Sequence, residues 1–159
     1  MKNVIASILF LAFLSCDGKT DNFYFTSFES PGQLSGWQQV DSSMLVNDPS
    51  PNGGAKSLNV GAGCYGPRPY VTLILPEGDY RLRFWAKNSQ GSLGGGVSLQ
   101  NTGTNESISI DVQDYNWIFY ESGRTIRSRI LQRFELHVDA GGIAYGNITV
   151  DQISIEKVN

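Results

Sequence analysis

The residues best suited to ligand binding lie in the segment YRLRFWAK, over residues 80–87. Trp85 shares one face of the expected strand with Arg81 and Arg83. Aromatic rings stack on the apolar C–H faces of sugar rings, while flanking polar side chains bond the hydroxyl groups. This pattern predicts a binding platform for a polysaccharide or oligosaccharide. The alternative is that a loop covers Trp85 and that the charges form an ordinary solvated sheet face.

The segment ILQRFELHVD, over residues 130–139, is expected to extend this platform. Its polar residues Arg133, Glu135 and His137 alternate with an apolar face that starts at Ile130. We expect this strand to be a neighbour of the 80–87 strand on the concave sheet. Arginine-rich residues 124–133 also suggest an anionic glycan, since guanidinium groups pair with carboxylate or sulfate. Mixed charge on an exposed strand is the simpler explanation.

Two tyrosines in the loop CYGPRPY, Tyr65 and Tyr70, are secondary candidates for one wall of a cleft. Packing within the loop is the alternative for both. Catalysis has little support, because His137 is the single histidine of the chain and no nucleophile motif surrounds it. No cluster of histidine and cysteine has transition-metal spacing. We therefore expect a binding protein that is not an enzyme.

The elements that position these residues are expected to be strands. Apolar and polar residues alternate in both segments described above, and the short runs VSLQ, SISIDV and NITVDQISIEKV have the same character. Turn-forming sequences such as PEGD, NTGTNE and DAGG separate them. This pattern predicts an all-β fold, an antiparallel β-sandwich made of two packed sheets.

The N-terminal residues predict a targeting segment. The apolar run from Val4 to Leu14 is far shorter than the ~20 residues of a membrane-spanning helix, and it follows Lys2 as in a signal peptide. Together with Cys16 it resembles the lipobox of bacterial lipoproteins, in which the cysteine is lipidated. The resemblance implies a signal peptide over 1–15, a lipid-anchored tether over 16–24 and a sandwich domain over 25–159. An ordinary secretory signal is the alternative.

Composition limits the partners. The chain has 12 basic and 15 acidic residues among 159, a net charge of −3 at pH 7. The basic surface typical of nucleic-acid-binding proteins is therefore absent, and we expect no nucleic-acid partner. Lipidation would hold the domain at a membrane of the bacterial cell envelope, the outer membrane being favoured. Which side of that membrane it faces stays open.

Four segments follow one another in an order that is typical of one group of domains: FTSFESPGQLSGWQ, GGAKSLNV, LPEGDYRLRFWAKN and GNITVDQISIEKVN. Together they resemble the jelly-roll carbohydrate-binding modules of bacterial glucanases and xylanases, within the galactose-binding-like superfamily. The resemblance covers nearly all of the chain after the tether. It implies a jelly-roll sandwich that binds carbohydrate. The rival hypothesis is an interaction lipoprotein whose sheet face docks another envelope protein.

The same resemblance implies one structural Ca²⁺ ion where the first and last strands meet. The matching residues here are Glu29 in SFES and Asp151 in TVDQIS. Ca²⁺ takes about 6–8 oxygen ligands, and an ion at this place would tie the two ends of the domain together. The alternative is that Asp151 marks a strand bulge and Glu29 caps a turn, both in contact with solvent.

Overall fold

The computed structural model describes residues 21–63, 66–89, 94–141 and 146–158, which form strands and two short 3-10 helices. Cys16, Cys64 and Tyr65 lie outside the described residues. The helices are η1 (Pro31–Leu34) and η2 (Ser42–Met44). The strands are β1 (Asp21–Thr26), β2 (Trp37–Gln38), β3 (Leu45–Val46), β4 (Ser57–Gly61), β5 (Tyr70–Leu75), β6 (Gly78–Asn88), β7 (Gly95–Asn101), β8 (Ser107–Val112), β9 (Ile118–Glu121), β10 (Ile126–Ser128), β11 (Gln132–Asp139) and β12 (Asn147–Val158).

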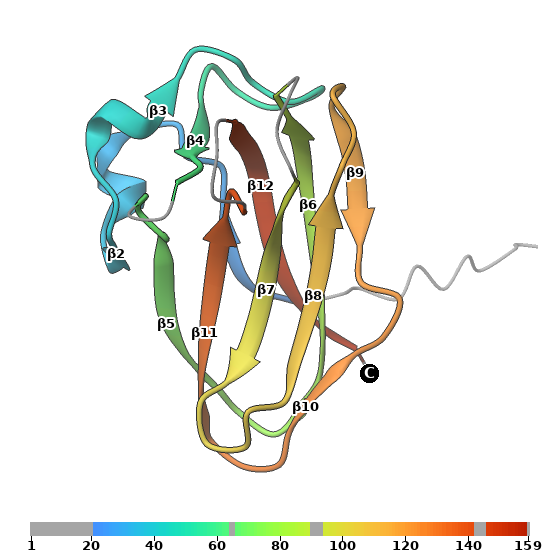
Figure 1. Cartoon of the computed structure of the whole chain (residues 1–159). Coiled ribbons are helices and arrows are strands. Elements are labelled where there is room, and N and C mark those ends of the chain that lie inside the picture. Colours follow the sequence, from blue (N-terminus) through green and yellow to red (C-terminus); the bar gives the residue numbers. More distant parts are fainter. Residues whose placement is uncertain (1–20, 64–65, 90–93, 142–145, 159) are drawn as a thin grey trace, which may run out of the picture.

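The strands form two sheets that pack face to face (Figure 1). The five-stranded sheet has the order β2-β5-β11-β7-β8. The seven-stranded sheet has the order β10-β6-β12-β4-β3, with β1 added on β12 and β9 on β6. All of these pairings are antiparallel. The structure therefore confirms the predicted antiparallel β-sandwich.

The core follows from the alternation of apolar and polar residues along each strand. In β6 the side chains of Leu82 and Phe84 are fully buried, and in β11 those of Phe134 and Leu136 are as well. Successive strand residues point to opposite faces, so the polar residues between them lie outside. Ile130 is an exception to the prediction. It is 68% exposed, because β11 begins only at Gln132 and Ile130 belongs to the turn after β10.

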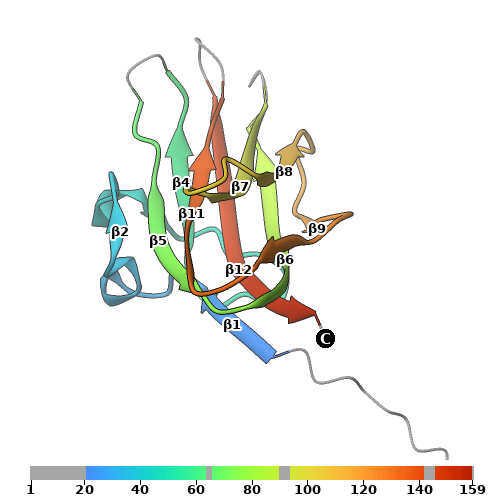
Figure 2. The same ribbon diagram turned by 90° about the horizontal axis from the view of Figure 1, so that it is seen from below.

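The first and last strands lie side by side. β1 pairs with the C-terminal half of β12 (Figure 2). In its pairing with β6, β12 has a register shift between Asp151 and Ser154. Asp151 pairs with Trp85 and so lies on the outer face of the sheet, where the loop over residues 50–55 lies against it and its side chain is fully buried. The predicted tether over 16–24 includes the first residues of β1, which begins at Asp21. Among the described residues no helix has the length and apolar character needed to cross a membrane.

Candidate functional site

The two halves of the predicted platform lie on opposite sides of the molecule. β6 carries Trp85, Arg81 and Arg83 and belongs to the seven-stranded sheet, whereas β11 belongs to the five-stranded sheet. The outer faces of two packed sheets point away from each other. The prediction that Arg133, Glu135 and His137 adjoin Trp85 is therefore wrong. β11 has β5 and β7 as its neighbours instead of β6.

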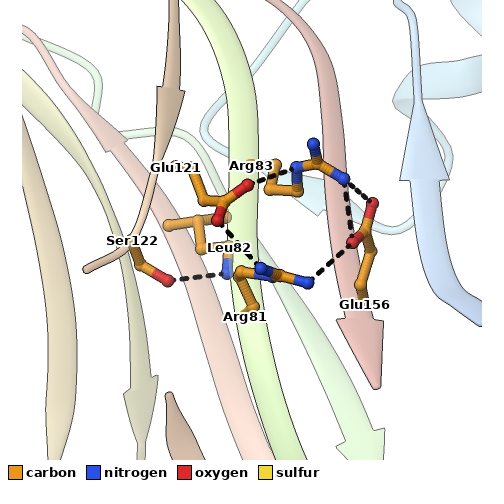
Figure 3. Close-up of polar contacts among 6 residues, drawn as sticks. All are labelled: Arg81, Leu82, Arg83, Glu121, Ser122 and Glu156. Carbon is orange, nitrogen blue, oxygen red and sulfur yellow. Dashed lines mark hydrogen bonds and ion pairs between the residues drawn. The ribbon is translucent and has the colours of Figure 1, made fainter. Parts of the chain in front are cut away.

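The two arginines of β6 are held by two glutamates (Figure 3). Arg81 lies 2.8 Å from Glu121 Oε1 through Nη1, and Arg83 lies 2.8 Å from Glu156 Oε1 through Nη1. Arg83 Nε is also 3.0 Å from Glu121 Oε2, and Arg81 Nη2 is 3.8 Å from Glu156 Oε2. The two positive and two negative charges balance within this cluster. Binding of a glycan by Arg81 and Arg83 stays a prediction.

Trp85 is covered by the neighbouring strand. It pairs across the sheet with Phe119 of β9, and the two ring centroids are 5.5 Å apart. The Arg83 guanidinium lies 5.0 Å from the centroid of the Phe119 ring, a cation–π contact. Trp85 is half-buried in consequence. These contacts account for a tryptophan on the outer face without a ligand, and its binding role also stays a prediction.

The outer face of the five-stranded sheet brings other candidates together. Across four strands the register aligns Tyr70, His137, Ser98 and Ser109 in one row. The Tyr70 and His137 rings are stacked, with centroids 5.3 Å apart and an interplanar angle of 26°. The two rings are followed by two small hydroxyl side chains. A ridge of aromatic surface therefore borders a lower polar floor.

The adjacent row supplies further polar groups. It consists of Thr72, Glu135, Gln100 and Ser107, in the order of the strands. Glu135 Oε2 lies 3.2 Å from His137 Nε2, which links the two rows. Both side chains are about a quarter exposed, so they are positioned by each other and still reach solvent. Hydroxyl, amide, carboxylate and imidazole groups are thus presented on one surface.

This surface is hollowed. Two adjoining pockets of about 420 and 290 Å³ share Ser98 and Asp139, and we call them together the five-stranded face cleft. The larger pocket extends over Gly96 to Asp111, which pair with each other across β7 and β8. A Cβ added at Gly96 would lie 2.7 Å from the carbonyl oxygen of Ile110, so a side chain there would strain the sheet. Gly96 therefore leaves this part of the cleft floor without side-chain atoms.

Sequence reasoning found part of this cleft. Tyr70 and His137 line it, while Glu135 lies beside His137 in the next row. The sequence-based prediction did not include four other lining residues: Ser98, Gln100, Asp111 and Asp139. It also did not include Arg68, which forms a 3.4 Å ion pair with Asp139. The alternation in VSLQ and SISIDV points to Ser98, Gln100 and Asp111, because it places their side chains on the outer face. The serine and glycine residues that form the hollow are less distinctive in a sequence than a tryptophan.

The arginine-rich segment does not form a continuous row. Arg127 lies in β10 of the seven-stranded sheet, whereas Arg133 lies in β11 of the five-stranded sheet. Arg129 is in the turn between them. These three arginines therefore do not line up along one strand. Arg133 Nη2 donates to the hydroxyl of Thr72 at 3.5 Å, at the margin of the polar rows.

The two residues predicted to hold calcium converge on one loop, over residues 50–55. Asp151 Oδ2 accepts the backbone N–H of Ser50 at 3.0 Å, and Glu29 Oε2 accepts that of Ala55 at 2.6 Å. Between these contacts stand Gly53 and Gly54. A Cβ at Gly53 would lie 2.4 Å from Asp151 Oδ2, and one at Gly54 would lie 2.3 Å from Glu29 Oε2. A side chain at either position would have to displace a carboxylate, so the two glycines let the loop approach both acids closely.

Among the described residues, no basic side chain forms an ion pair with Glu29 or Asp151. Asp151 is fully buried, and Glu29 Oε1 is a buried oxygen with no hydrogen-bond partner in the part of the chain that the structure describes. Burial raises the pKa of Asp151 above its ordinary value, backbone and side-chain hydrogen bonds from Ser50 oppose this shift, and the charge of Glu29 adds to it. Two carboxylates near each other in a desolvated place are costly unless a cation binds them. The solvated alternative is wrong for Asp151, although the bulge itself is present.

Backbone strain gathers at the same place. Of the five non-glycine residues with positive φ in the described chain, three adjoin this site: Phe28 before Glu29, Asn52 before Gly53, and Gln152 after Asp151. Such conformations cost about 1–3 kcal/mol each and cluster at functional sites and ligand clamps. The donor set of carboxylate oxygens suits a hard cation such as Ca²⁺. In the described chain no three or more histidine, cysteine, aspartate or glutamate side chains form a metal-binding group, so further ligands would be other oxygens.

Comparison of the sequence with protein-family models and with curated proteins gives no match. Solved structures do resemble this one. The CBM22-1 xylan-binding domain from Paenibacillus barcinonensis has a TM-score of 0.60 and 16% identity, over 88% of this chain and 96% of that chain. A family 22 module from Clostridium thermocellum has a TM-score of 0.59 and 16% identity, over 86% and 92%.

A third likeness is to TmCBM61, solved in complex with β-1,4-galactotriose. Its TM-score is 0.53 with 17% identity, over 84% of this chain and 99% of that chain. At these identities the likeness concerns the fold. The described chain therefore has the jelly-roll sandwich fold of carbohydrate-binding modules.

Proposed function

We propose that this protein is a non-catalytic carbohydrate-binding protein and that the five-stranded face cleft is its binding site. The observation that carries the proposal is the stacked pair of Tyr70 and His137 at the border of a hollow lined with hydroxyl, amide and carboxylate groups. A sugar ring can place its apolar face against the aromatic ridge while its hydroxyls reach the polar floor. The xylan- and galactotriose-binding proteins of the same fold support this proposal.

The charges of the cleft favour a neutral glycan. The larger pocket is lined by the carboxylates Asp111 and Asp139 and by no basic residue of the described chain. In the smaller pocket Arg68 is paired with Asp139. A uronic acid or sulfated sugar would meet repulsion in the larger pocket, whereas carboxylates accept hydrogen bonds from neutral sugar hydroxyls.

We infer that Glu29 and Asp151 hold one structural Ca²⁺ ion. The orphaned oxygen of Glu29, the buried carboxylate of Asp151 and the glycine loop between them support this inference. The ion would supply positive charge that stabilises both carboxylates. It would also join β12, the loop over 50–55 and the segment after β1. Its role is structural, because the five-stranded face cleft is lined by neither carboxylate.

We further propose that the chain is a lipoprotein of the bacterial cell envelope, attached to the membrane through a lipid on Cys16. The lipobox-like residues before Cys16 support this proposal. The interaction hypothesis stays the alternative, in which a sheet face docks an envelope protein. A docking face is flatter and more apolar than a sugar-binding cleft, so the hollow with mixed polar groups favours carbohydrate.

The function is tested by affinity electrophoresis of the full chain, in detergent, through gels that contain neutral or anionic polysaccharides. We expect retardation by at least one neutral polysaccharide such as xylan or β-1,4-galactan. Carboxylated and sulfated polysaccharides should retard the protein less. No retardation by any polysaccharide, from protein shown to be folded by circular dichroism, would favour the docking alternative.

A further inference from the structure

A second cleft lies on the opposite side of the sandwich, on the outer face of the seven-stranded sheet. Its volume is about 400 Å³, within the range of small-molecule sites. Its lining residues come mainly from the end of β6, the start of β12 and the segment over 113–117 that links β8 to β9. Figure 1 shows the course of these elements. It shares no lining residue with the five-stranded face cleft. We call it the seven-stranded face cleft.

Its floor is built by the strand register. Thr149 of β12 pairs with Asn59 of β4 on one side and with Lys87 of β6 on the other, so the three side chains stand in one row. Asn59 Nδ2 donates a hydrogen bond to Thr149 Oγ1 at 2.8 Å. An amide fixed through its nitrogen presents its carbonyl oxygen as an acceptor. The floor therefore offers an oriented acceptor.

An ion pair fixes one wall. Lys87 Nζ lies 2.7 Å from Asp48 Oδ2 and donates to Asp48 Oδ1 at 2.9 Å. The same ammonium group lies 5.1 Å from the centroid of the Trp117 ring. Held by both partners, Lys87 provides a positioned donor, and Asp48 provides an acceptor beside it. Because the pair is neutral as a whole, it suits hydroxyl groups better than a charged ligand.

The other wall is an exposed aromatic side chain. Tyr115 is 55% exposed and lines the cleft together with Asn116. The backbone of their segment is anchored, because the carbonyl oxygen of Asp114 accepts the N–H of Asn88 at 2.7 Å. The hydroxyl of Tyr120 also donates to Asp114 Oδ2 at 2.9 Å. An aromatic ring is thus held at the edge of a polar hollow.

We propose that the seven-stranded face cleft is a second saccharide subsite that takes a neutral sugar unit. The Tyr115 ring would stack on the sugar, and Asn59, Lys87 and Asp48 would bond its hydroxyls. The inference rests on the proposed function in one respect, the class of ligand. Two subsites on opposite faces allow one molecule to hold two glycan chains, which raises its retention on a polysaccharide through avidity.

The test is isothermal titration calorimetry of the full chain with five probes: xylohexaose, β-1,4-galactotriose, cellohexaose, mannohexaose and laminarihexaose. For at least one probe we expect two equivalents bound by wild type and one by the variant with both Tyr115→Ala and Asn116→Ala. Tyr115→Phe, which keeps the ring, should keep two. Phe25→Ala, which removes another exposed aromatic on this sheet, should also keep two.

Each other result contradicts a defined part of the account. One equivalent that Tyr70→Ala removes and the Tyr115→Ala, Asn116→Ala variant retains would overturn the second subsite and leave the proposed function. One equivalent that only the Tyr115→Ala, Asn116→Ala variant removes would establish this subsite and overturn the placement of binding on the five-stranded face. No heat with any of the five probes would overturn both.

Discussion

Replacing Tyr70 with alanine is expected to weaken glycan binding about 30-fold. The substitution removes one ring of the stacked Tyr70–His137 pair, which forms the aromatic border of the five-stranded face cleft. Burying an aromatic side chain against a ligand contributes about 1.5–3 kcal/mol, and each 1.4 kcal/mol is about tenfold in affinity. The measurement is the dissociation constant for the polysaccharide that retards wild type most, from affinity electrophoresis. Tyr70→Ala is compared with its parent in the Tyr115→Ala, Asn116→Ala background, so that the seven-stranded face cleft does not contribute to retardation.

Two matched variants separate stacking from other effects. Tyr70→Phe keeps the ring and should lose less than about threefold in affinity, the worth of a single modest hydrogen bond. Trp85→Ala removes a larger aromatic side chain from the opposite sheet and should leave the affinity of the five-stranded face cleft unchanged. Loss of binding in Trp85→Ala together with retained binding in Tyr70→Ala would contradict a binding site in the five-stranded face cleft. That result would place the site on the seven-stranded sheet.

Removing calcium is expected to lower the melting temperature by about 5–10 °C. A ligand that binds only the folded state at 100 times its dissociation constant adds about 2.7 kcal/mol of stability. For a domain of this size each kcal/mol corresponds to about 2–4 °C. The measurement compares melting curves, by circular dichroism, in 1 mM calcium and after dialysis against a chelator. Magnesium should substitute poorly, since it demands a tighter octahedral shell.

The variant Glu29→Gln separates a calcium ligand from a residue with a purely structural role, because its effect on stability should differ between chelator and calcium. Glutamine can keep the acceptor for the Ala55 N–H, while it removes the charge and the orphaned carboxylate oxygen. In chelator the variant should be at least as stable as wild type, because repulsion of Asp151 is relieved. In calcium it should be less stable than wild type. Equal loss of stability in both conditions would contradict a metal at this place, and Glu106→Gln serves as the exposed control.

The alternation of apolar and polar residues predicted which face of each strand is buried. It did not predict which strands pair with each other. The alternation in β6 and β11 placed Phe84 and Phe134 in the core and Trp85 and His137 outside, as the structure confirms. Period-2 alternation reports which side of its own strand a residue occupies. It carries no information on which strands pair over long sequence separations. The joint platform of Trp85 and His137 failed at this step, since their strands lie in different sheets.

The predicted parts of the cleft were its conspicuous residues. His137 and Tyr70 attracted attention as an imidazole and an aromatic ring. The hollow itself arises because Gly96 and Ser98 of β7 and Ser109 of β8 lie next to them. Small residues are common in strands and turns, so only the register reveals their shared role. The approach of Asp151 to Ser50, 101 positions away in sequence, is likewise a product of tertiary structure.

Binding of carbohydrate in the five-stranded face cleft can be followed through the NMR signal of one side chain. His137 is the only histidine of the chain, so the ring protons of an untagged protein give a unique reporter inside the cleft. Titration with the polysaccharide fragment that binds best should shift these signals progressively and to saturation. Binding that saturates by calorimetry while the His137 signals stay unmoved would contradict carbohydrate binding in this cleft.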